Sequence, residues 1–150
     1  MSVFQKIQKI ASPIIIENGA YLVDLGMRGE NGRKIIEVYI DTDKGITTDE
    51  CAAVSRKISR VVDDHVVIHG RYHLVVSSPG LDRPLKLARQ YPKNTGRTLS
   101  VKVRHDNQAE NLEGELIDAD SNGIALRLSV DEVRRIVYDA IIEARVNAAW

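Results

Sequence analysis

Residues 74–85 read Leu74-Val75-Val76-Ser77-Ser78-Pro79-Gly80-Leu81-Asp82-Arg83-Pro84-Leu85, and the rest of the chain is organised around them. The apolar, β-branched start of this stretch suits a buried strand. Pro79 and Gly80 are the residue types that a type II turn favours at its two central positions. Pro84 biases the residue before it towards extended backbone, and Asp82 can pair with Arg83. The stretch therefore predicts a strand that leaves a sheet through a stiff exit.

Taken alone, this stretch could be a simple turn with a surface ion pair, which contributes only about 0–1 kcal/mol to stability. However, residues 76–85 resemble, without a gap, the signature of the bacterial ribosome maturation factor P (RimP) family. Two weaker matches precede it in the expected order. They read Gly19-Ala20-Tyr21-Leu22-Val23-Asp24-Leu25, and Val38-Tyr39-Ile40-Asp41 with Gly45-Ile46-Thr47 and Asp49-Glu50-Cys51-Ala52. The last third of the chain is similar to the family only in its general pattern.

The resemblance implies an α+β fold, with an N-terminal αββαβ domain followed by a small C-terminal SH3-like, Sm-related β-barrel. It implies a non-catalytic assembly factor that binds the immature small ribosomal subunit and promotes its maturation. The implied partners are ribosomal RNA and ribosomal protein twelve of that subunit. The signature would be a ribosome-binding or interdomain motif formed by Ser77, Ser78, Pro79, Gly80, Leu81, Asp82, Arg83, Pro84 and Leu85.

The composition is that of a globular protein. Of the 150 residues, 43% are hydrophobic and 28% are charged, which allows one domain or two small ones. The first residues lack the basic start and apolar run of a secretory signal, so we expect a cytoplasmic monomer that binds no membrane. The single cysteine, Cys51, excludes an internal disulfide and a multi-cysteine zinc site. We expect Cys51 in the core, since no neighbouring motif would activate it as a nucleophile.

The first 77 residues predict the order helix, strand, strand, helix, strand. A helical repeat runs through Val3, Ile7, Ile10, Ala11 and Ile14 and ends at Gly19, with Pro13 either kinking the helix or restarting it. Alternating residues predict a hairpin of strands 21–28 and 34–41, turning at 29–32. Thr47 and Glu50 fit a capping box, which starts a helix whose inner face carries Cys51, Val54, Ile58 and Val61. The last strand is 72–77.

The second half predicts short elements. Residues 87–91 suit one helical turn before Pro92, and 94–96 read as a break. Strands are expected at 98–104, 112–119, 123–128, 133–137 and 142–146, with a tight turn at 120–123, and five short strands suggest a small barrel. We therefore expect an α/β domain over 1–84, a basic linker over 85–97 and a barrel over 98–150.

The net charge is zero but unevenly distributed. Residues 1–80 are neutral, 81–105 carry a net +6, and 106–150 carry a net −6. Phosphate backbones favour a basic segment, whereas a basic protein favours an acidic one. The candidate RNA contacts are Arg56, Lys57, Arg60, Lys86, Arg89, Lys93 and Arg97. The candidate ribosomal-protein contacts are Glu113, Glu115 and Asp118. Alternatively, both sets only solubilise the protein.

Other chemistries find little support. Residues 41–52 begin like a calcium loop but place Ile46 and Ala52 where Gly and Glu are required. His65, His69 and His73 have the spacing of helical zinc ligands, but Gly70 and the following strand argue against a helix there. No nucleotide or hydrolase motif is present, so we expect no enzyme, metal or cofactor. The rival function is an Sm-type module acting on non-ribosomal RNA, which the acidic end and the scarcity of aromatic residues disfavour.

Overall fold

A computed structural model of the chain describes residues 1–65, 67–80 and 83–148. Its contacts divide the chain into two compact units, Met1–Pro79 and Gly80–Trp150. The first unit contains α1 (Val3–Glu17), β1 (Tyr21–Glu30), β2 (Arg33–Asp41), α2 (Thr48–Asp64) and β3 (Tyr72–Ser77). This is the predicted order of helix, strand, strand, helix, strand.

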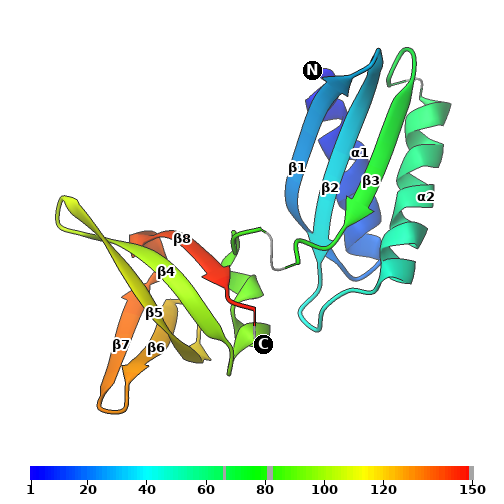
Figure 1. The fold of residues 1–150 in the computed structure, drawn as a ribbon. Coiled ribbons are helices and arrows are strands. Elements are labelled where there is room, and N and C mark those ends of the chain that lie inside the picture. The colour runs from blue at the N-terminus through cyan, green and yellow to red at the C-terminus, as the bar shows by residue number, and fades with distance from the viewer. Residues whose placement is uncertain (66, 81–82, 149–150) are drawn as a thin grey trace. The chain divides into compact units, whose positions relative to one another are not determined.

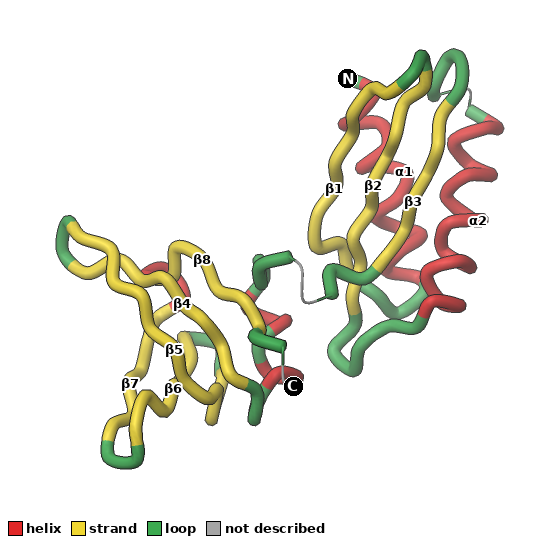
Figure 2. Tube along the Cα trace, viewed as in Figure 1, coloured by secondary structure: helices red, strands yellow, loops and turns green. Residues whose placement is uncertain are grey.

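The sheet of the first unit has the order β1-β2-β3, with β1 antiparallel and β3 parallel to the central β2. Both helices cover one face of it (Figures 1 and 2). Ile36, Val38 and Ile40 of β2 are almost completely buried in a core that also contains Ile7 of α1 and Ile58 of α2. Alternation along β2 therefore sets which face the helices cover.

Helix α1 is one continuous helix. The Ser2 hydroxyl accepts a hydrogen bond from the Gln5 amide, and Pro13 lies inside the helix rather than at the start of a second one, so the restart predicted as one alternative does not occur. The helix ends as predicted: Gly19 has a φ of +77°, and the Ala20 amide donates to the Ile15 carbonyl at 3.1 Å. This pairing is the Schellman motif, which favours glycine at that position because glycine has no Cβ to strain.

Two local predictions need correction. After Cys51, Val54 and Ile58, the buried face of α2 carries Val62 and not the predicted Val61. A step of four residues from Ile58 returns closer to the same side of the helix than a step of three, because one turn contains about 3.6 residues. Strand β3 is not a buried strand: it lies at an edge of the sheet, its residues alternate between half-buried and exposed, and Val75 is 37% exposed. Helices cover only one face of the sheet, so a continuous apolar run does not imply burial on both faces.

The second unit is a five-stranded antiparallel sheet. Its elements are β4 (Thr98–His105), β5 (Gln108–Ala119), β6 (Gly123–Ser129), β7 (Glu132–Val137) and β8 (Ile141–Val146). The order is β7-β6-β5-β4-β8, so β7 and β8 form its two edges in the described residues. All five predicted strands are present, and β5 starts four residues earlier than expected. The structure shows a sheet, and it does not show the closed barrel that we expected.

Residues 85–97 pack on the second unit. The Leu85 amide donates to the Ala144 carbonyl of β8 at 2.7 Å. Two short 3-10 turns follow, Ala88–Gln90 and Pro92–Asn94. Tyr91 between them is buried, with its ring 5.3 Å from that of Tyr138, and burial followed by the influence of Tyr138 raises its pKa to about 12. The segment expected to be a linker thus supplies part of the second core.

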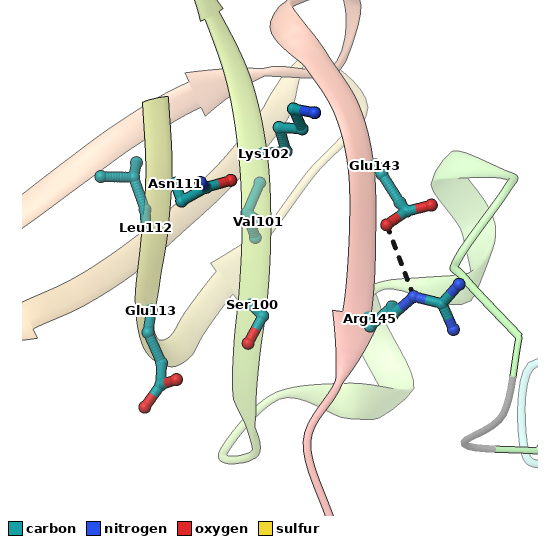
Figure 3. A pocket seen from close by; sticks show the side chains of 8 residues that line it. All are labelled: Ser100, Val101, Lys102, Asn111, Leu112, Glu113, Glu143 and Arg145. Carbon is teal, nitrogen blue, oxygen red and sulfur yellow. Dashed lines mark hydrogen bonds and ion pairs between the residues drawn. The ribbon is translucent and has the colours of Figure 1, made fainter. Parts of the chain in front are cut away.

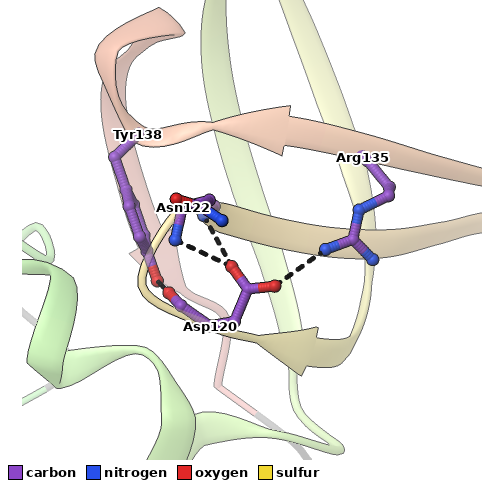
Figure 4. A network of polar contacts seen from close by, with 5 residues as sticks. Asp120, Asn122, Arg135 and Tyr138 are labelled. Carbon is purple, nitrogen blue, oxygen red and sulfur yellow. Dashed lines mark hydrogen bonds and ion pairs between the residues drawn. The ribbon is translucent and has the colours of Figure 1, made fainter.

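The predicted tight turn between β5 and β6 is held by one carboxylate (Figure 4). Asp120 accepts hydrogen bonds from the amides of Asn122 and Gly123, and its second oxygen accepts one from Arg135 at 3.0 Å. The Tyr138 hydroxyl donates to the Asp120 carbonyl at 2.7 Å. The amides, and then Arg135, lower the pKa of the Asp120 carboxyl. This network joins β7 and the following turn to the β5–β6 connection.

Candidate functional site

The signature residues span the point at which the contacts divide the chain. Ser77 ends β3, Ser78 is exposed, and Pro79 is buried as the last residue of the first unit. Arg83, Pro84 and Leu85 are partly buried in the second unit. Leu81 and Asp82 lie outside the described residues, and so does the Asp82–Arg83 pair predicted from sequence. The signature therefore belongs to both units.

The backbone of the exit agrees with the turn predicted there. Gly80 has a φ of +62°, the positive value that the third residue of a type II turn requires. Any other residue would be strained at that angle, which explains why Pro-Gly stands there. On the far side, the hydrogen bond from Leu85 to Ala144 attaches the exit to β8.

The basic residues predicted on α2 are exposed, but one of them has a structural partner. Arg56, Lys57 and Arg60 all lie on the outer face of the helix. The Nζ of Lys57 donates a 2.9 Å hydrogen bond to Oδ1 of Asn18, the residue that ends α1. Lys57 therefore joins the two helices, whereas no such bond is found for Arg56 or Arg60 within the described ranges.

The four basic residues predicted between the domains lie on or beside the 3-10 turns. Lys86, Arg89 and Arg97 are exposed, and Lys93 is partly buried. Nη1 of Arg97 approaches Oδ1 of the buried Asn94 at 3.4 Å. Because the backbone beneath them packs on the second core, these charges are held on an ordered surface.

The predicted acidic residues lie together on β5. Glu113 and Glu115 are exposed and alternate with the buried Gly114 and Leu116. Simple alternation would turn Asp118 towards the core. A register shift between Leu116 and Asp118 inserts one extra residue, and as a result Asp118 is exposed as well. In the part of the chain that the structure describes, none of the three carboxylates forms an ion pair, whereas Glu110 pairs with Arg134 at 3.0 Å.

Glu113 also borders a shallow hollow of about 420 Å³ across β5, β4 and β8 (Figure 3). Lys102 of β4 lies directly opposite Glu143 of β8 in the ladder, and Glu143 pairs with Arg145 at 3.4 Å. The hollow is lined by Ser100, Val101, Lys102, Asn111, Leu112, Glu113, Glu143 and Arg145. It therefore presents both signs of charge to a partner.

Strands β4 and β8 contribute to this surface, although no motif in the sequence marks their residues as candidates. Alternation along each strand indicates that Lys102, Glu143 and Arg145 face outward. Nothing in the sequence pairs β4 with β8, because three strands separate them along the chain. The basic segment and the acidic segment thus meet within one sheet, so their separation along the sequence is not kept in space.

The cysteine and the histidines considered as chemical groups lie in ordinary structural positions. Cys51 lies in the core as predicted, and burial, followed by Glu50 and Asp41, raises the pKa of its thiol. His65 ends α2, while His73 belongs to β3. Within residues 1–65, 67–80 and 83–148, no three His, Cys, Asp or Glu side chains are grouped as a metal site requires. Among the helices of those ranges, none is long and apolar enough to cross a membrane.

Residues 10–82 match the family model described as the RimP N-terminal domain. The match begins within α1, includes the three strands and α2, and ends inside the signature at the exit from the first unit. The first unit therefore carries the N-terminal domain of the RimP family, a family of ribosome maturation factors.

Proposed function

We propose that this protein is a non-catalytic assembly factor that binds the immature small ribosomal subunit and promotes its maturation. The observation that carries the proposal is the RimP N-terminal domain at residues 10–82. In this role the protein acts in the cytoplasm as a monomer. The second unit acts as an SH3-like, Sm-related module, for which the five-stranded antiparallel sheet is a suitable framework.

The contacts are divided between two kinds of charge. Ribosomal protein twelve of the small subunit binds the acidic side chains of β5, because Glu113, Glu115 and Asp118 are exposed and form no ion pair with another described residue. Ribosomal RNA binds the basic turns that carry Lys86, Arg89, Lys93 and Arg97, with Arg56 and Arg60 adding charge on α2. Residues 77–85 act as the interdomain motif that connects the first unit to the second.

Sedimentation of cell extract tests the main proposal. The protein should travel with free small subunits and not with assembled ribosomes, because an assembly factor leaves before the subunit enters translation. Recovery only with assembled ribosomes, or outside all ribosomal fractions, would refute the function.

Two sets of variants test the division of contacts. Reversing Glu113, Glu115 and Asp118 to lysine should weaken binding to purified ribosomal protein twelve. The same reversal should not weaken RNA binding. Replacing Lys86, Arg89, Lys93 and Arg97 with glutamine should weaken RNA binding and flatten its salt dependence, because fewer neutralised phosphates release fewer counterions. Reversal of Glu17, Asp131 and Asp139, which are exposed away from β5 and form no ion pair with another described residue, is the control for net charge. Equal effects of both sets on both ligands would contradict the assignment.

The alternative is an Sm-type module that acts on non-ribosomal RNA. It predicts that the protein is recovered with small RNAs outside ribosomal fractions. The exposed carboxylates on β5 disfavour it, since they repel phosphate.

A further inference from the structure

A second hollow lies on the first unit, far along the chain from the signature. It measures about 290 Å³ and lies between the start of α1 and the end of α2. Its lining is Met1, Lys6, Lys9, Ile10, His65 and Val67. None of these residues belongs to the sets assigned above to RNA or protein contacts. This volume is at or below the lower limit of small-molecule sites, about 300 Å³, so the hollow suits a surface contact rather than an enclosed cofactor.

The lining of this hollow combines two cationic side chains with apolar ones. Lys6, Lys9 and Ile10 are three and four residues apart on α1, so they lie on one side of the helix. In the described residues neither lysine forms an ion pair or a side-chain hydrogen bond, and the first turn of α1 carries no acidic residue. The two amines are therefore available for an anionic partner.

The imidazole of His65 lines the hollow, and one of its two ring nitrogens has a hydrogen-bond partner on α2. Its Nδ1 lies 3.0 Å from the Val61 carbonyl oxygen. A carbonyl can only accept, so Nδ1 carries the proton and Nε2 is left for another group. In that tautomer Nε2 is an acceptor, so it suits a ribose hydroxyl rather than a phosphate oxygen. Asp63, two residues before His65, accepts a hydrogen bond from the Tyr72 hydroxyl, so this carboxylate already has a partner on β3.

More basic residues lie at the same end of the first unit. The start of α1, the β1–β2 turn and the connection from α2 to β3 all lie at that end (Figure 1). Arg33 and Lys34 follow the turn, and the Lys34 amide donates to the Arg71 carbonyl at 3.0 Å just before β3. Arg33 and Arg71 are exposed. Several separated cations favour a ligand with repeated negative charges over a single small anion.

We propose that this hollow binds backbone phosphates of RNA, with Lys6 and Lys9 neutralising phosphate and Ile10 and Val67 contacting the sugar. This inference rests on the proposed function, which brings ribosomal RNA to the protein. It adds a contact on the first unit, at the end opposite its exit. RNA is favoured over an acidic protein because its phosphates recur at short, regular spacing and alternate with less polar sugars, which suits a lining of two amines and apolar side chains.

The test uses the full chain and a 20-nucleotide RNA hairpin as the probe. Replacing Lys6 and Lys9 together with glutamine should weaken binding and lower the slope of log affinity against log salt by about 2, one for each phosphate that is no longer neutralised. Lys44→Gln is the matched control: it removes an exposed lysine from the loop between β2 and α2, at the other end of the unit. It should leave the slope unchanged.

Two outcomes would overturn the inference: an unchanged slope in the double variant, or an equal weakening in the Lys44→Gln protein. In a nuclear magnetic resonance titration the hairpin should shift the backbone resonances of Lys6, Lys9 and His65. Shifts there with inorganic phosphate but not with the hairpin would overturn the assignment to RNA. Sedimentation of the unaltered protein with small subunits separates the two proposals. If it sediments with them and the double variant binds the hairpin normally, only this inference fails.

Discussion

Lys57 of α2 and Asn18 at the end of α1 are joined by a 2.9 Å hydrogen bond from Nζ to Oδ1. The Asn18 amide group also donates to the Ile14 carbonyl at 2.7 Å, so one side chain closes α1 and binds its neighbour. A residue predicted as an RNA contact thus has a role in helix packing, which separates it from Arg56 and Arg60 on the same helix.

Replacing Lys57 with methionine should lower the free energy of unfolding by about 0.5–1 kcal/mol, the net value of one exposed hydrogen bond. Both α-helices belong to the first unit, so urea unfolding followed by helical circular dichroism measures it. Arg56→Met is the control, because it removes a charge from the same helix face and no bond to Asn18. Equal destabilisation of both variants would show that charge, not the bond, matters.

Gly123→Ala should destabilise the second unit by about 1–3 kcal/mol, as overpacking does. An added Cβ would overlap the Ile136 carbonyl oxygen and lie 2.9 Å from the Val137 Cα, where β6 pairs with β7. Gly26→Ala in β1 is the control, since an added Cβ there meets nothing within 4 Å. Urea unfolding should leave the control as stable as the unaltered protein or slightly more stable. A tolerated Gly123→Ala variant would contradict the close approach of these strands.

Gln90→Ala should destabilise the second unit by about 1–3 kcal/mol, because two backbone amides lose their acceptor. The buried Gln90 accepts from the Lys86 and Leu87 amides, both at 2.7 Å, and its own carbonyl accepts from Asn94. Hydrogen exchange of the amides of residues 86–97 should accelerate most. The exposed Gln108 gives the matched control, Gln108→Ala. Unchanged exchange in 86–97 would show that the turns do not depend on Gln90.

Asp120 should stabilise the protein less in acid. Its folded pKa is lowered by the Asn122 and Gly123 amides and Arg135, so its stabilising contribution is complete above the unfolded pKa of about 3.8 and is lost as pH falls through the lower folded value. The gap in urea midpoint between the unaltered protein and Asp120→Ala should therefore shrink between about pH 7 and about pH 3. Asp118→Ala, which removes an exposed carboxylate from the strand that ends just before Asp120, is the comparison. A constant gap would exclude the carboxylate network as its cause.

Local patterns predicted most elements of the fold. The Thr47–Glu50 capping box starts α2, Gly19 ends α1, and the turn at Asp120 forms as expected, because each depends on hydrogen bonds between residues only a few positions apart. The candidate site was less predictable. The exposure of Asp118 depends on a register shift against β6, and sequence alternation contains no signal for an extra residue.

The sequence by itself determined the helices, the strands, the turn at the exit and the family of residues 10–82, since periodicity, caps and signature are properties of neighbouring residues. Only the tertiary structure decided which strands distant in the chain pair and what residues 85–97 contact. Pairing β4 with β8 brings Lys102 opposite Glu143, and packing Tyr91 into the second core makes the expected linker part of that unit. Both depend on contacts between residues far apart in the chain. Their free energy comes from burying apolar surface once the strands have assembled, and no local pattern records which surfaces will meet.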